Sequence, residues 1–395
     1  MIRDHEQMVM AVSDEFAAQF GGNEGVEISM APGRVNLIGE YTDFNDGFVF
    51  PMTLDRGVYI AARVRADTTV RLWSSQYREF AVLNLDEHEV PEPGSWPCYS
   101  AGVAYELFKQ GLIRRGFDAV IDGNLDLQAG LSSSAALEVA TAVSLRSLFG
   151  FDLEQVALVK LCHHVEHHYA QVFCGVMDQF ACGMGEAGHA LFLDCRSLHY
   201  ENIAVALGEY RILIVNTGVK RALASSAYNE RRAQCDEAVR RLVNEGIQAQ
   251  SLRDISPDQL EANKQRLPDL ILRRARHVVG ENQRVIDAVG ALKAADLNRL
   301  GELMLASHWS LSEDFEVSCE ELDFLVRNLS KYDGVLGARM TGAGFGGCAI
   351  AVVAVEAVDS VIHELSSAYH YQFGLTLSPL ALENNMSAGE VTLDW

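Results

Sequence analysis

The chain has 395 residues, 49% of them apolar, and its 32 basic against 54 acidic residues give a formal net charge of −22 at pH 7. Such a length can bury a large core and predicts two domains or one large two-lobed unit. The negative charge argues against nucleic acid or an anionic membrane as a partner, because like charges repel. A phosphorylated ligand would need a local positive site, such as a helix N-terminus, a metal ion or a few arginines.

The cysteines and the N-terminal segment indicate where in the cell the protein is located. The eight cysteines are scattered without a C-x-x-C pair, which favours reduced thiols over a disulfide framework. Residues 1–22 carry charges throughout and lack the continuous apolar core of a signal peptide. The longest apolar run, at 348–355, is far shorter than a membrane span. We expect a cytoplasmic protein with no membrane partner.

Hydrophobic periodicity predicts a mixed first half and a helix-rich second half. Up to residue 216 we expect, in chain order, a helix at 5–20, strands at 26–30, 57–64 and 70–73, a loop at 91–97, a helix at 100–114, a strand at 118–125, helices at 133–149 and 153–171, and strands at 190–194 and 211–216. Beyond it we expect mostly helix over 226–310, a glycine loop at 342–347, a buried strand at 348–355, and a closing helix and strand. This change of character predicts a domain division near 200–210.

The segment 31–47, APGRVNLIGEYTDFNDG, combines an arginine with several acidic side chains between turn glycines. Arg34 is flanked by apolar residues, which places its charge at the edge of a strand. Glu40, Asp43 and Asp46 follow in a stretch that is too polar and too Gly-bounded for a core. Carboxylates on such a loop suit a ligand rich in hydroxyl groups, since each oxygen accepts from O–H. The alternative is a solvated acidic turn beside one surface arginine.

The segment 130–140, GLSSSAALEVA, is a glycine loop with three hydroxyls that runs directly into strong helix formers. Free backbone N–H groups, the positive end of the helix dipole and serine hydroxyls together make an anion or phosphate cradle. It is not a Walker A loop, because the chain contains no Gly-Lys-Ser/Thr. The alternative is an ordinary serine N-cap.

The segment 342–348, GAGFGGC, matches G-x-G-x-x-G by pattern. A dinucleotide site requires a helix after this loop, whereas the residues that follow are apolar and β-branched and predict a strand. We therefore reject dinucleotide binding. The glycines either let the backbone approach a ligand or another loop closely, or form a structural tight turn.

Two further motifs carry titratable side chains in the middle of the chain. Asp178 stands among apolar residues in GVMDQF, where an aspartate is costly unless it pairs with an arginine, caps a helix or has a function. The run 163–168, HHVEHH, matches the zinc-protease pattern H-x-x-E-H, with His163 and His167 on one helix face. Four histidines in six residues make a chance match easy, so we favour a solvated histidine-rich face over zinc hydrolysis. Glu166 is a candidate second carboxylate for the site of Asp178.

Taken together and in this order, these segments resemble the galactokinase family of GHMP small-molecule kinases. The similarity extends to CGVMDQ at 174–179, SSAYNERRAQC at 225–235, MTGAGFGGC at 340–348 and LMLASHWSLSEDFEVS at 303–318. The resemblance implies an α+β, two-lobed GHMP kinase fold with a mixed-sheet N-terminal domain at 1–205, an α+β C-terminal domain at 206–395, and the active site in the cleft between them. It also implies ATP-dependent phosphorylation of galactose at its anomeric hydroxyl, with Mg²⁺ as cofactor.

The resemblance assigns roles by matching positions. Asp178 matches the catalytic aspartate and Arg34 the arginine that stabilises the transition state, while Ser134 and Glu166 match the magnesium ligands. The sugar-contacting positions it implies are Glu40, Tyr41, Thr42, Asp43, Gly175 and Tyr228. The nucleotide-contacting positions it implies are Gln128, Ala129, Gly130, Leu131, Ser132, Ser133, Ser134 and Trp96, the last as a tryptophan that stacks on adenine.

The sequence departs from the family where Tyr41 replaces a usual His and Phe44 a usual Tyr. A phenol in place of an imidazole changes size and hydrogen bonding in the sugar pocket. Two alternatives to a galactose kinase therefore follow: a kinase of the same family for a related hexose, amino sugar or uronic acid, and a non-catalytic sensor of sugar and ATP. The sequence leaves the oligomeric state open, a monomer included.

Overall fold

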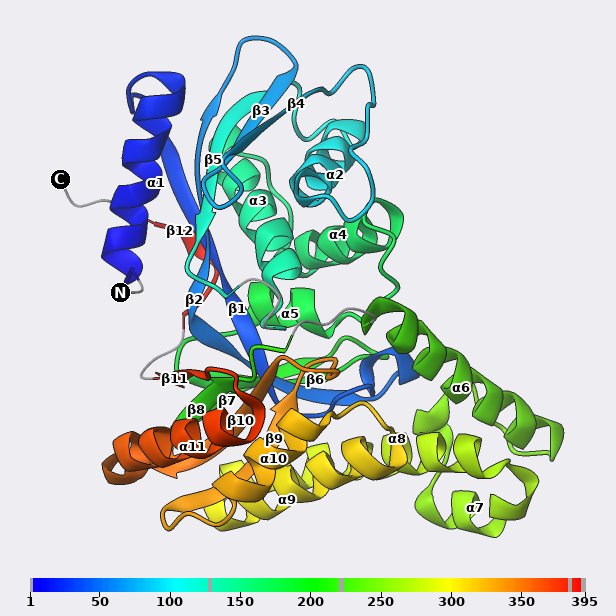
Figure 1. The fold of residues 1–395 in the computed structure, drawn as a ribbon. Helices are drawn as coiled ribbons and strands as arrows, with labels where there is room; N and C mark the ends of the chain where they lie inside the picture. The colour runs from blue at the N-terminus through cyan, green and yellow to red at the C-terminus, as the bar shows by residue number, and fades with distance from the viewer. Residues whose placement is uncertain (1–2, 127–129, 220–223, 383–385, 392–395) are drawn as a thin grey trace.

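Two β-sheets, one in each half of the molecule, organise the fold of the computed structural model (Figure 1). The structure describes residues 3–126, 130–219, 224–382 and 386–391. The strands are β1 (Glu27–Ile38), β2 (Phe48–Val64), β3 (Thr69–Ser74), β4 (Glu79–Asn84), β5 (Phe117–Gly123), β6 (His189–Asp194), β7 (Tyr200–Ala204), β8 (Tyr210–Asn216), β9 (Val335–Thr341), β10 (Cys348–Ala354), β11 (Ser378–Leu382) and β12 (Gly389–Glu390). The α-helices are α1 (His5–Phe20), α2 (Trp96–Lys109), α3 (Ser133–Phe149), α4 (Gln155–His168), α5 (Met177–Met184), α6 (Ala224–Asn244), α7 (Pro257–Ala262), α8 (Asp269–Lys293), α9 (Leu297–Trp309), α10 (Glu320–Leu329) and α11 (Val358–Phe373).

The first sheet is mixed, as the resemblance implied. Its strands run in the order β12-β1-β2-β5-β3-β4, with β6 beside β2 and β7 beside β6, and only β3 and β5 pair in parallel among the described strands. Helix α1 covers one face, where its Val12 and Phe16 pack with Tyr59 and Val120 of the sheet. Helices α2, α3 and α4 cover the other face (Figure 1). Of these, α3 packs directly on β1 and β2, so its N-terminus lies next to the middle of β1.

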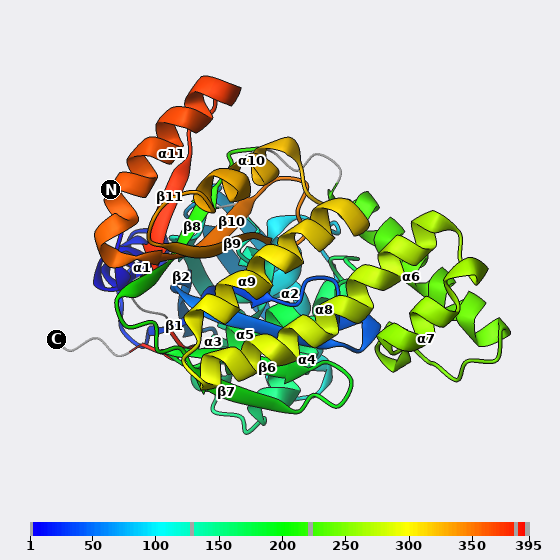
Figure 2. The same cartoon turned by 90° about the horizontal axis from the view of Figure 1, so that it is seen from below.

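The second sheet is antiparallel, in the order β11-β8-β10-β9. Strand β10 is buried on both faces, which explains its continuous apolar sequence. Ile350 and Val352 pack on the side of α9, whereas Ala351 and Val353 join the core beneath α10 and α11. Figure 2 shows α8 and α9 lying side by side across the face of this half, where they also contact the end of β1.

The long strands β1 and β2 correct the shorter strands predicted at 26–30 and 57–64. Strand β1 continues through Pro32 to Ile38, because register shifts between Pro32 and Arg34 and between Asn36 and Ile38 absorb the residues that interrupt the alternation. Arg34 therefore lies within a strand rather than at its edge, and only 4% of it is exposed. This burial excludes the interpretation of Arg34 as a surface arginine.

The other elements follow the prediction with local differences. Helix α3 has the predicted bounds, and the predicted helical stretch at 226–310 is confirmed as α6, α7, α8 and α9. Helix α2 begins before the predicted residue 100, because Pro97 fits the first turn of a helix. Strands β4, β7 and β9 and the helices α5 and α10 were not predicted. The three strands and the short helix α5 are too short for a clear period. No helix among the described residues is long and apolar enough to cross a membrane.

Helix α9 lies so close to β9 that glycine is required at the contact. A Cβ atom built on Gly301 would lie 2.2 Å from the carbonyl oxygen of Leu336, and one on Gly337 would lie 2.2 Å from the oxygen of Gly301. Both clashes involve backbone atoms, which cannot rotate away. The backbone approach therefore fixes α9 on the second sheet, where α9 carries residues of the buried network described below.

We expect Gly301→Ala to lower the free energy of unfolding by about 1–3 kcal/mol, because the added methyl forces α9 away from β9. The matched control is Gly290→Ala in α8, where a Cβ meets no atom within 4 Å. That substitution should be neutral or stabilise by up to about 1 kcal/mol, since alanine favours the helix. Urea unfolding of both variants measures the difference, and equal effects would contradict the close packing.

Candidate active site

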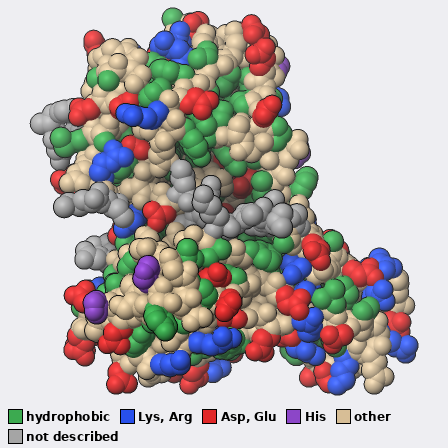
Figure 3. Space-filling model, in the orientation of Figure 1, with side chains coloured by type: hydrophobic (Ala, Val, Ile, Leu, Met, Phe, Trp, Pro, Cys, Tyr) green, Lys and Arg blue, Asp and Glu red, His purple; other side chains and the backbone are tan. Residues whose placement is uncertain are grey.

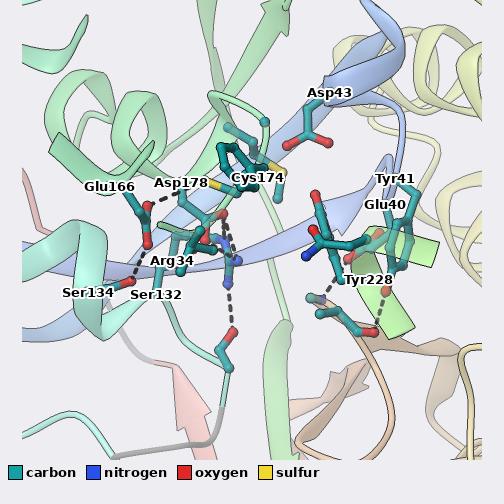
Figure 4. Close-up of a pocket in the computed structure, with 18 of the residues that line it drawn as sticks. Arg34, Glu40, Tyr41, Asp43, Ser132, Ser134, Glu166, Cys174, Asp178 and Tyr228 are labelled. Atoms are coloured by element: carbon teal, nitrogen blue, oxygen red, sulfur yellow. Dashed lines mark hydrogen bonds and ion pairs between the residues drawn. The ribbon is translucent and has the colours of Figure 1, made fainter. Parts of the chain in front are cut away.

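A pocket of about 400 Å³ lies between the two halves and brings together segments from both (Figures 3 and 4). The surface is hollowed between these halves in Figure 3. The predicted site residues that line the pocket are Arg34, Glu40, Tyr41, Asp43, Gly130, Ser132, Ser133, Ser134, Glu166, Gly175, Asp178 and Tyr228. Residues separated by more than 100 positions in the sequence thus meet at one place.

Other predicted site residues lie elsewhere. The hydroxyl of Thr42 is buried and donates to the backbone oxygens of Gly39 and Phe48, so it holds the loop rather than facing the pocket. Leu131 is buried, and its carbonyl oxygen accepts from the backbone N–H of Arg34 at 3.1 Å. Gln128 and Ala129 lie outside the described residues.

Arg34 and Asp178 form a two-pronged ion pair at the centre of the pocket (Figure 4). Nε of Arg34 donates to Oδ1 of Asp178 at 2.9 Å, and Nη2 donates to Oδ2 at 2.8 Å. Nη1 donates to the carbonyl oxygen of Gly130 at 2.7 Å. Burial lowers the pKa of Arg34, but the charge and hydrogen bonds of Asp178 outweigh burial and raise it overall. The aspartate therefore pairs with an arginine, as one of the sequence interpretations held.

The N-terminus of α3 faces the same ion pair. Ser132 occupies the N-cap position in a left-handed conformation, and its hydroxyl makes no capping hydrogen bond. It donates instead to Oδ2 of Asp178 at 2.5 Å. The interpretation of an ordinary serine cap is therefore wrong for Ser132. An uncapped helix N-terminus at a pocket wall is the arrangement that binds anions.

Ser134 and Glu166 lie together beside Asp178. The hydroxyl of Ser134 donates to Oε1 of Glu166 at 3.0 Å, and Gln179 donates to Oε2. Burial, followed by the nearby charge of Asp178, raises the pKa of Glu166. A cation between these side chains would offset both effects. Two oxygen donors about 3.0 Å apart also fit neighbouring positions around Mg²⁺, whose ligands lie at about 2.1 Å in an octahedron.

Glu40 is buried in an ionic network, contrary to the expectation that its segment is too polar for a core. Its Oε2 pairs with Nη2 of Arg339, and its Oε1 accepts from the backbone N–H of Gly342 at 3.0 Å. Arg339 is fully buried on β9 and also lies 3.7 Å from Glu281 of α8. Burial raises the pKa of Glu40, and the charge of Arg339 opposes that rise. Paired charges of this kind tolerate a dry interior, whereas single ones do not.

Asp43 reaches the pocket because its neighbour has no side chain. A Cβ on Gly175 would lie 2.0 Å from Oδ2 of Asp43, so only glycine fits at 175. Burial, followed by the charge of Asp178, raises the pKa of Asp43 to about 6. The carboxylate thus faces the cavity from the side opposite the phosphate-type cradle at α3 (Figure 4).

Aromatic rings close the pocket beside Asp43. The ring of Tyr41 lies 5.2 Å from that of Tyr228 and 4.7 Å from that of Phe315, between ring centres. Its hydroxyl donates to the carbonyl oxygen of Ala343 at 2.5 Å. Phe44 packs edge-on against Tyr228 at 5.6 Å. The two residues that depart from the family are therefore part of one packed aromatic wall.

The glycine loop connects β9 and β10 and contacts the segment after β1. A strand follows this loop rather than a helix, which confirms the rejection of a dinucleotide site. Gly342 and Ala343 line the pocket. Gly344 has a φ of 72°, and a Cβ on it would lie 2.1 Å from the carbonyl oxygen of Val317. The glycines therefore serve close approach to a neighbouring loop and to the cavity.

Trp96 lies in an adjoining hollow of about 200 Å³ that shares Ser133 and Ser134 with the main pocket. Its ring stacks on Tyr77 with an angle of 11° between the planes. The buried indole N–H has no hydrogen-bond partner among the described residues. A flat aromatic surface beside the helix N-terminus suits a planar heterocycle.

The histidine run divides into two faces. His164 and His168 are exposed and stack on each other, as a solvated face would. His163 and His167 are partly buried, and a ring nitrogen of each lies within 3.2 Å of the carbonyl oxygen of Cys174. The interpretation of one solvated histidine face is therefore correct for only half of the run.

Several residues at the site were not predicted, and two of them, Arg339 and Cys174, bind its carboxylates. Arg339 is the charged residue of a buried, mostly apolar strand that leads into the glycine loop. A single charge in such a strand is the sequence feature that could have indicated a buried ion pair. Cys174 lines the pocket directly before Gly175, and its thiol lies 3.4 Å from Oε2 of Glu166. No local pattern distinguishes Cys174 from the other scattered cysteines.

Comparison with known proteins agrees with this geometry. Family models match as "Galactokinase galactose-binding signature" at residues 14–64, "GHMP kinases N terminal domain" at 99–186 and "GHMP kinases C terminal" at 288–370. The mevalonate kinase of Methanococcus jannaschii shares the fold, with a TM-score of 0.65, 20% identity, and coverage of 91% of this chain and 98% of that one. The fold is that of a GHMP small-molecule kinase.

The chain is 44% identical to the galactokinase of Chloroflexus aurantiacus (92% of this chain, 93% of that protein) and 42% identical to that of Bacillus subtilis (91% and 93%). It belongs to the galactokinase family. The crystal structure of Lactococcus lactis galactokinase complexed with galactose matches with a TM-score of 0.93 and 40% identity, over 98% of this chain and 100% of that one. These likenesses do not favour a kinase for another sugar or a non-catalytic sensor.

We expect Arg339→Met to lower the free energy of unfolding by roughly 3–5 kcal/mol, because it leaves the Glu40 carboxylate buried without its partner. The matched control is Arg299→Met on the surface of α9, where the ion pair with Glu302 is exposed to solvent. That control should change stability by less than about 1 kcal/mol. Urea unfolding distinguishes the two, and a small loss in Arg339→Met would show that the network is dispensable.

Proposed function

We propose that Arg34 and Asp178 are the catalytic pair with which this member of the galactokinase family transfers the γ-phosphoryl group of ATP to the anomeric hydroxyl of galactose. The observation that carries the proposal is the position of this pair. It lies between the N-terminus of α3 on one side and the Asp43 loop on the other, inside a single pocket. A donor phosphate and an acceptor sugar bound at those two places would meet at Asp178.

Asp178 is placed to accept the proton of the attacking hydroxyl. Its carboxylate is held by Arg34 and Ser132, so its orientation is fixed before the sugar binds. The contacts described use three of the five N–H donors of Arg34. We assign the other two to the transferring group, whose negative charge spreads over its oxygens in the transition state.

Magnesium would be held by Ser134 and Glu166, the hydroxyl and carboxylate that meet at one end of the pocket. When bound, the cation neutralises charge on the β- and γ-phosphates. The N-terminus of α3 holds the phosphates through its free N–H groups. The hollow at Trp96 takes the adenine, which makes α3 the bridge between base and phosphates.

The sugar site is built by Asp43 and the segment around it. The carboxylate of Asp43 accepts from sugar hydroxyls, while Gly175 leaves the space for it. The rings of Tyr41 and Tyr228 provide the apolar wall beside it. Glu40 acts on the sugar site indirectly. Arg339 and Gly342 already bind its carboxylate oxygens, so these contacts hold the loop in place.

The boundary between the lobes and the location of the protein are also part of this proposal. We place the boundary between residues 205 and 206, because β7 belongs to the first sheet and β8 to the second. No disulfide joins the eight cysteines, all of which lie in the described part of the chain, and this agrees with a reducing cytoplasm.

Asp178→Asn should fold and bind galactose but lose turnover by roughly 10²-fold or more, because the amide cannot accept the proton. Asp14→Asn, on the exposed face of α1, is the control and should retain full activity. A coupled assay of ADP release measures kcat, and calorimetry measures galactose binding. Near-normal kcat in Asp178→Asn would remove this residue from the mechanism, whereas loss of galactose binding would assign it a binding role.

The pKa of Asp43, about 6, predicts how galactose binding depends on pH. Below this pH the carboxyl is protonated and loses an acceptor, so the KM for galactose should rise as the pH falls from 8 to 5. Asp43→Asn should raise KM at pH 8 by about tenfold or more and make KM insensitive to pH in this range. KM measured across the range at saturating ATP decides this. A pH-dependent KM in the variant would assign the titration to another group.

A further inference from the structure

We infer that His163, His167 and Cys174 form a site for a soft divalent transition metal of the Zn²⁺ class in the wall of the active-site pocket, and that metal bound there inhibits the kinase. The binding site stands on its own geometry. Only the inhibitory consequence rests on the proposed function, because it invokes the role of Glu166 and of the pocket that Cys174 lines.

The three side chains already converge. His163 and His167 lie one turn apart on α4, with ring centres 4.2 Å apart. The ligand atoms of the two imidazoles and the Cys174 thiol all lie within 4.8 Å of one another. Bond lengths of about 2.1 Å to nitrogen and 2.3 Å to sulfur in a tetrahedral zinc site place such atoms about 3.5 Å apart. Contraction by about 1 Å completes three positions of that tetrahedron.

The shortening of the distances between the three ligand atoms can come from a movement of Cys174, whose backbone is irregular. Cys174 lies in the segment between α4 and α5, which forms neither helix nor strand. The helix bearing both histidines can therefore stay in place while Cys174 moves toward them. Among the described residues this is the cluster in which three nitrogen or sulfur ligands meet.

The donor set selects a soft metal over the magnesium proposed nearby. Imidazole nitrogen and thiolate sulfur favour Zn²⁺ and its neighbours, whereas Mg²⁺ requires oxygen ligands. Binding converts the Cys174 thiol to a thiolate and releases one proton to solvent. Glu166 lies beside the site, with Oε2 at 3.4 Å from Sγ of Cys174, and its charge attracts the cation.

The same helix contains a matched pair that lacks the third ligand. His164 and His168 have the same spacing, and their rings stack with centres 3.8 Å apart on the exposed face. No cysteine joins them in the part of the chain that the structure describes. The spacing of histidines alone therefore does not make the site, and Cys174 is the residue that distinguishes the two pairs.

Inhibition follows from the position of Cys174 in the pocket wall. Its thiol donates to Glu166, the carboxylate proposed to hold Mg²⁺ with Ser134. A metal on the thiolate removes that hydrogen bond and draws the Glu166 carboxylate toward a second cation. It also moves the backbone next to Gly175, against which Asp43 packs. Both the magnesium site and the sugar site are then displaced.

The binding test is a titration of the full-length protein with Co²⁺ alone, without ATP or galactose. We expect one equivalent to bind with the near-ultraviolet absorption of a cobalt–thiolate bond and with release of about one proton. Cys174→Ser should lose the absorption, and His163→Gln or His167→Gln should weaken binding at least tenfold. The double variant His164→Gln/His168→Gln should bind as the parent does.

Absence of the thiolate absorption in the parent, or its persistence unchanged in His163→Gln and His167→Gln, would overturn the site. Loss of binding in His164→Gln/His168→Gln would place the metal on the other face and overturn it too. Thermal unfolding identifies any variant that fails to fold, and the two single histidine variants then decide the result independently of Cys174→Ser.

The activity test adds buffered free Zn²⁺ at saturating Mg²⁺ and ATP and compares each protein with its own zinc-free rate. We expect inhibition of the parent that excess zinc-selective chelator reverses, and at least tenfold weaker inhibition of His163→Gln. Cobalt binding without zinc inhibition would overturn the inhibitory role and leave the site intact. If the parent phosphorylates no galactose at all, the proposed function fails while the cobalt titration still decides the site.

Discussion

The buried pair of Glu40 and Arg339 is the interaction on which the arrangement of the active site depends. Glu40 follows β1 of the first sheet, Arg339 lies on β9 of the second, and Glu281 and Ser307 bring α8 and α9 into the same network. Charges at this depth have no water to stabilise them, so each requires the others in fixed positions. The network therefore sets the position of the loop that presents Asp43 and of the glycine loop that Gly342 begins.

Close backbone approach is the second constraint. Glycine is required at 175 by Asp43, at 301 by β9 and at 344 by the loop after α9, because a side chain at each position would overlap neighbouring atoms. At 301 and 344 the close neighbour is backbone, whereas at 175 it is the side chain of Asp43. Of these three glycines, Gly175 lines the pocket, where its missing side chain leaves space for the Asp43 carboxylate.

Much of this structure could be predicted from the sequence where a signal is local. The helix at 133–149 consists of strong helix formers between a serine loop and Gly150, so its bounds were predicted correctly. Strand β1 was cut short in the prediction, since its bulges interrupt the alternation that identifies a strand. The contiguous motifs identified Arg34, Asp178 and the serine loop. Arg339 was missed because its partner lies at position 40, and a distant partner leaves no mark on the neighbouring residues. Cys174 was missed although Glu166 is only eight residues away, because no local pattern shows that the chain turns back to bring the two side chains together.

The same geometry explains how a protein of net charge −22 binds a polyanion. Four carboxylates line the pocket, and the negative charge of each is compensated in its own way. They belong to Glu40, Asp43, Glu166 and Asp178. Arg339 neutralises Glu40, and Arg34 neutralises Asp178. We propose Glu166 for a cation and Asp43 for the hydroxyl groups of a neutral ligand. In the proposed site, the positive potential that phosphates require would come from the N-terminus of α3, from the N–H groups of Arg34 and from a metal ion held by Ser134 and Glu166. The fields of these groups are short-ranged, so the site attracts phosphate only at close distance, and the surrounding acidic surface does not attract it. Specificity for the ligand therefore rests on its fit within the pocket rather than on long-range electrostatic steering.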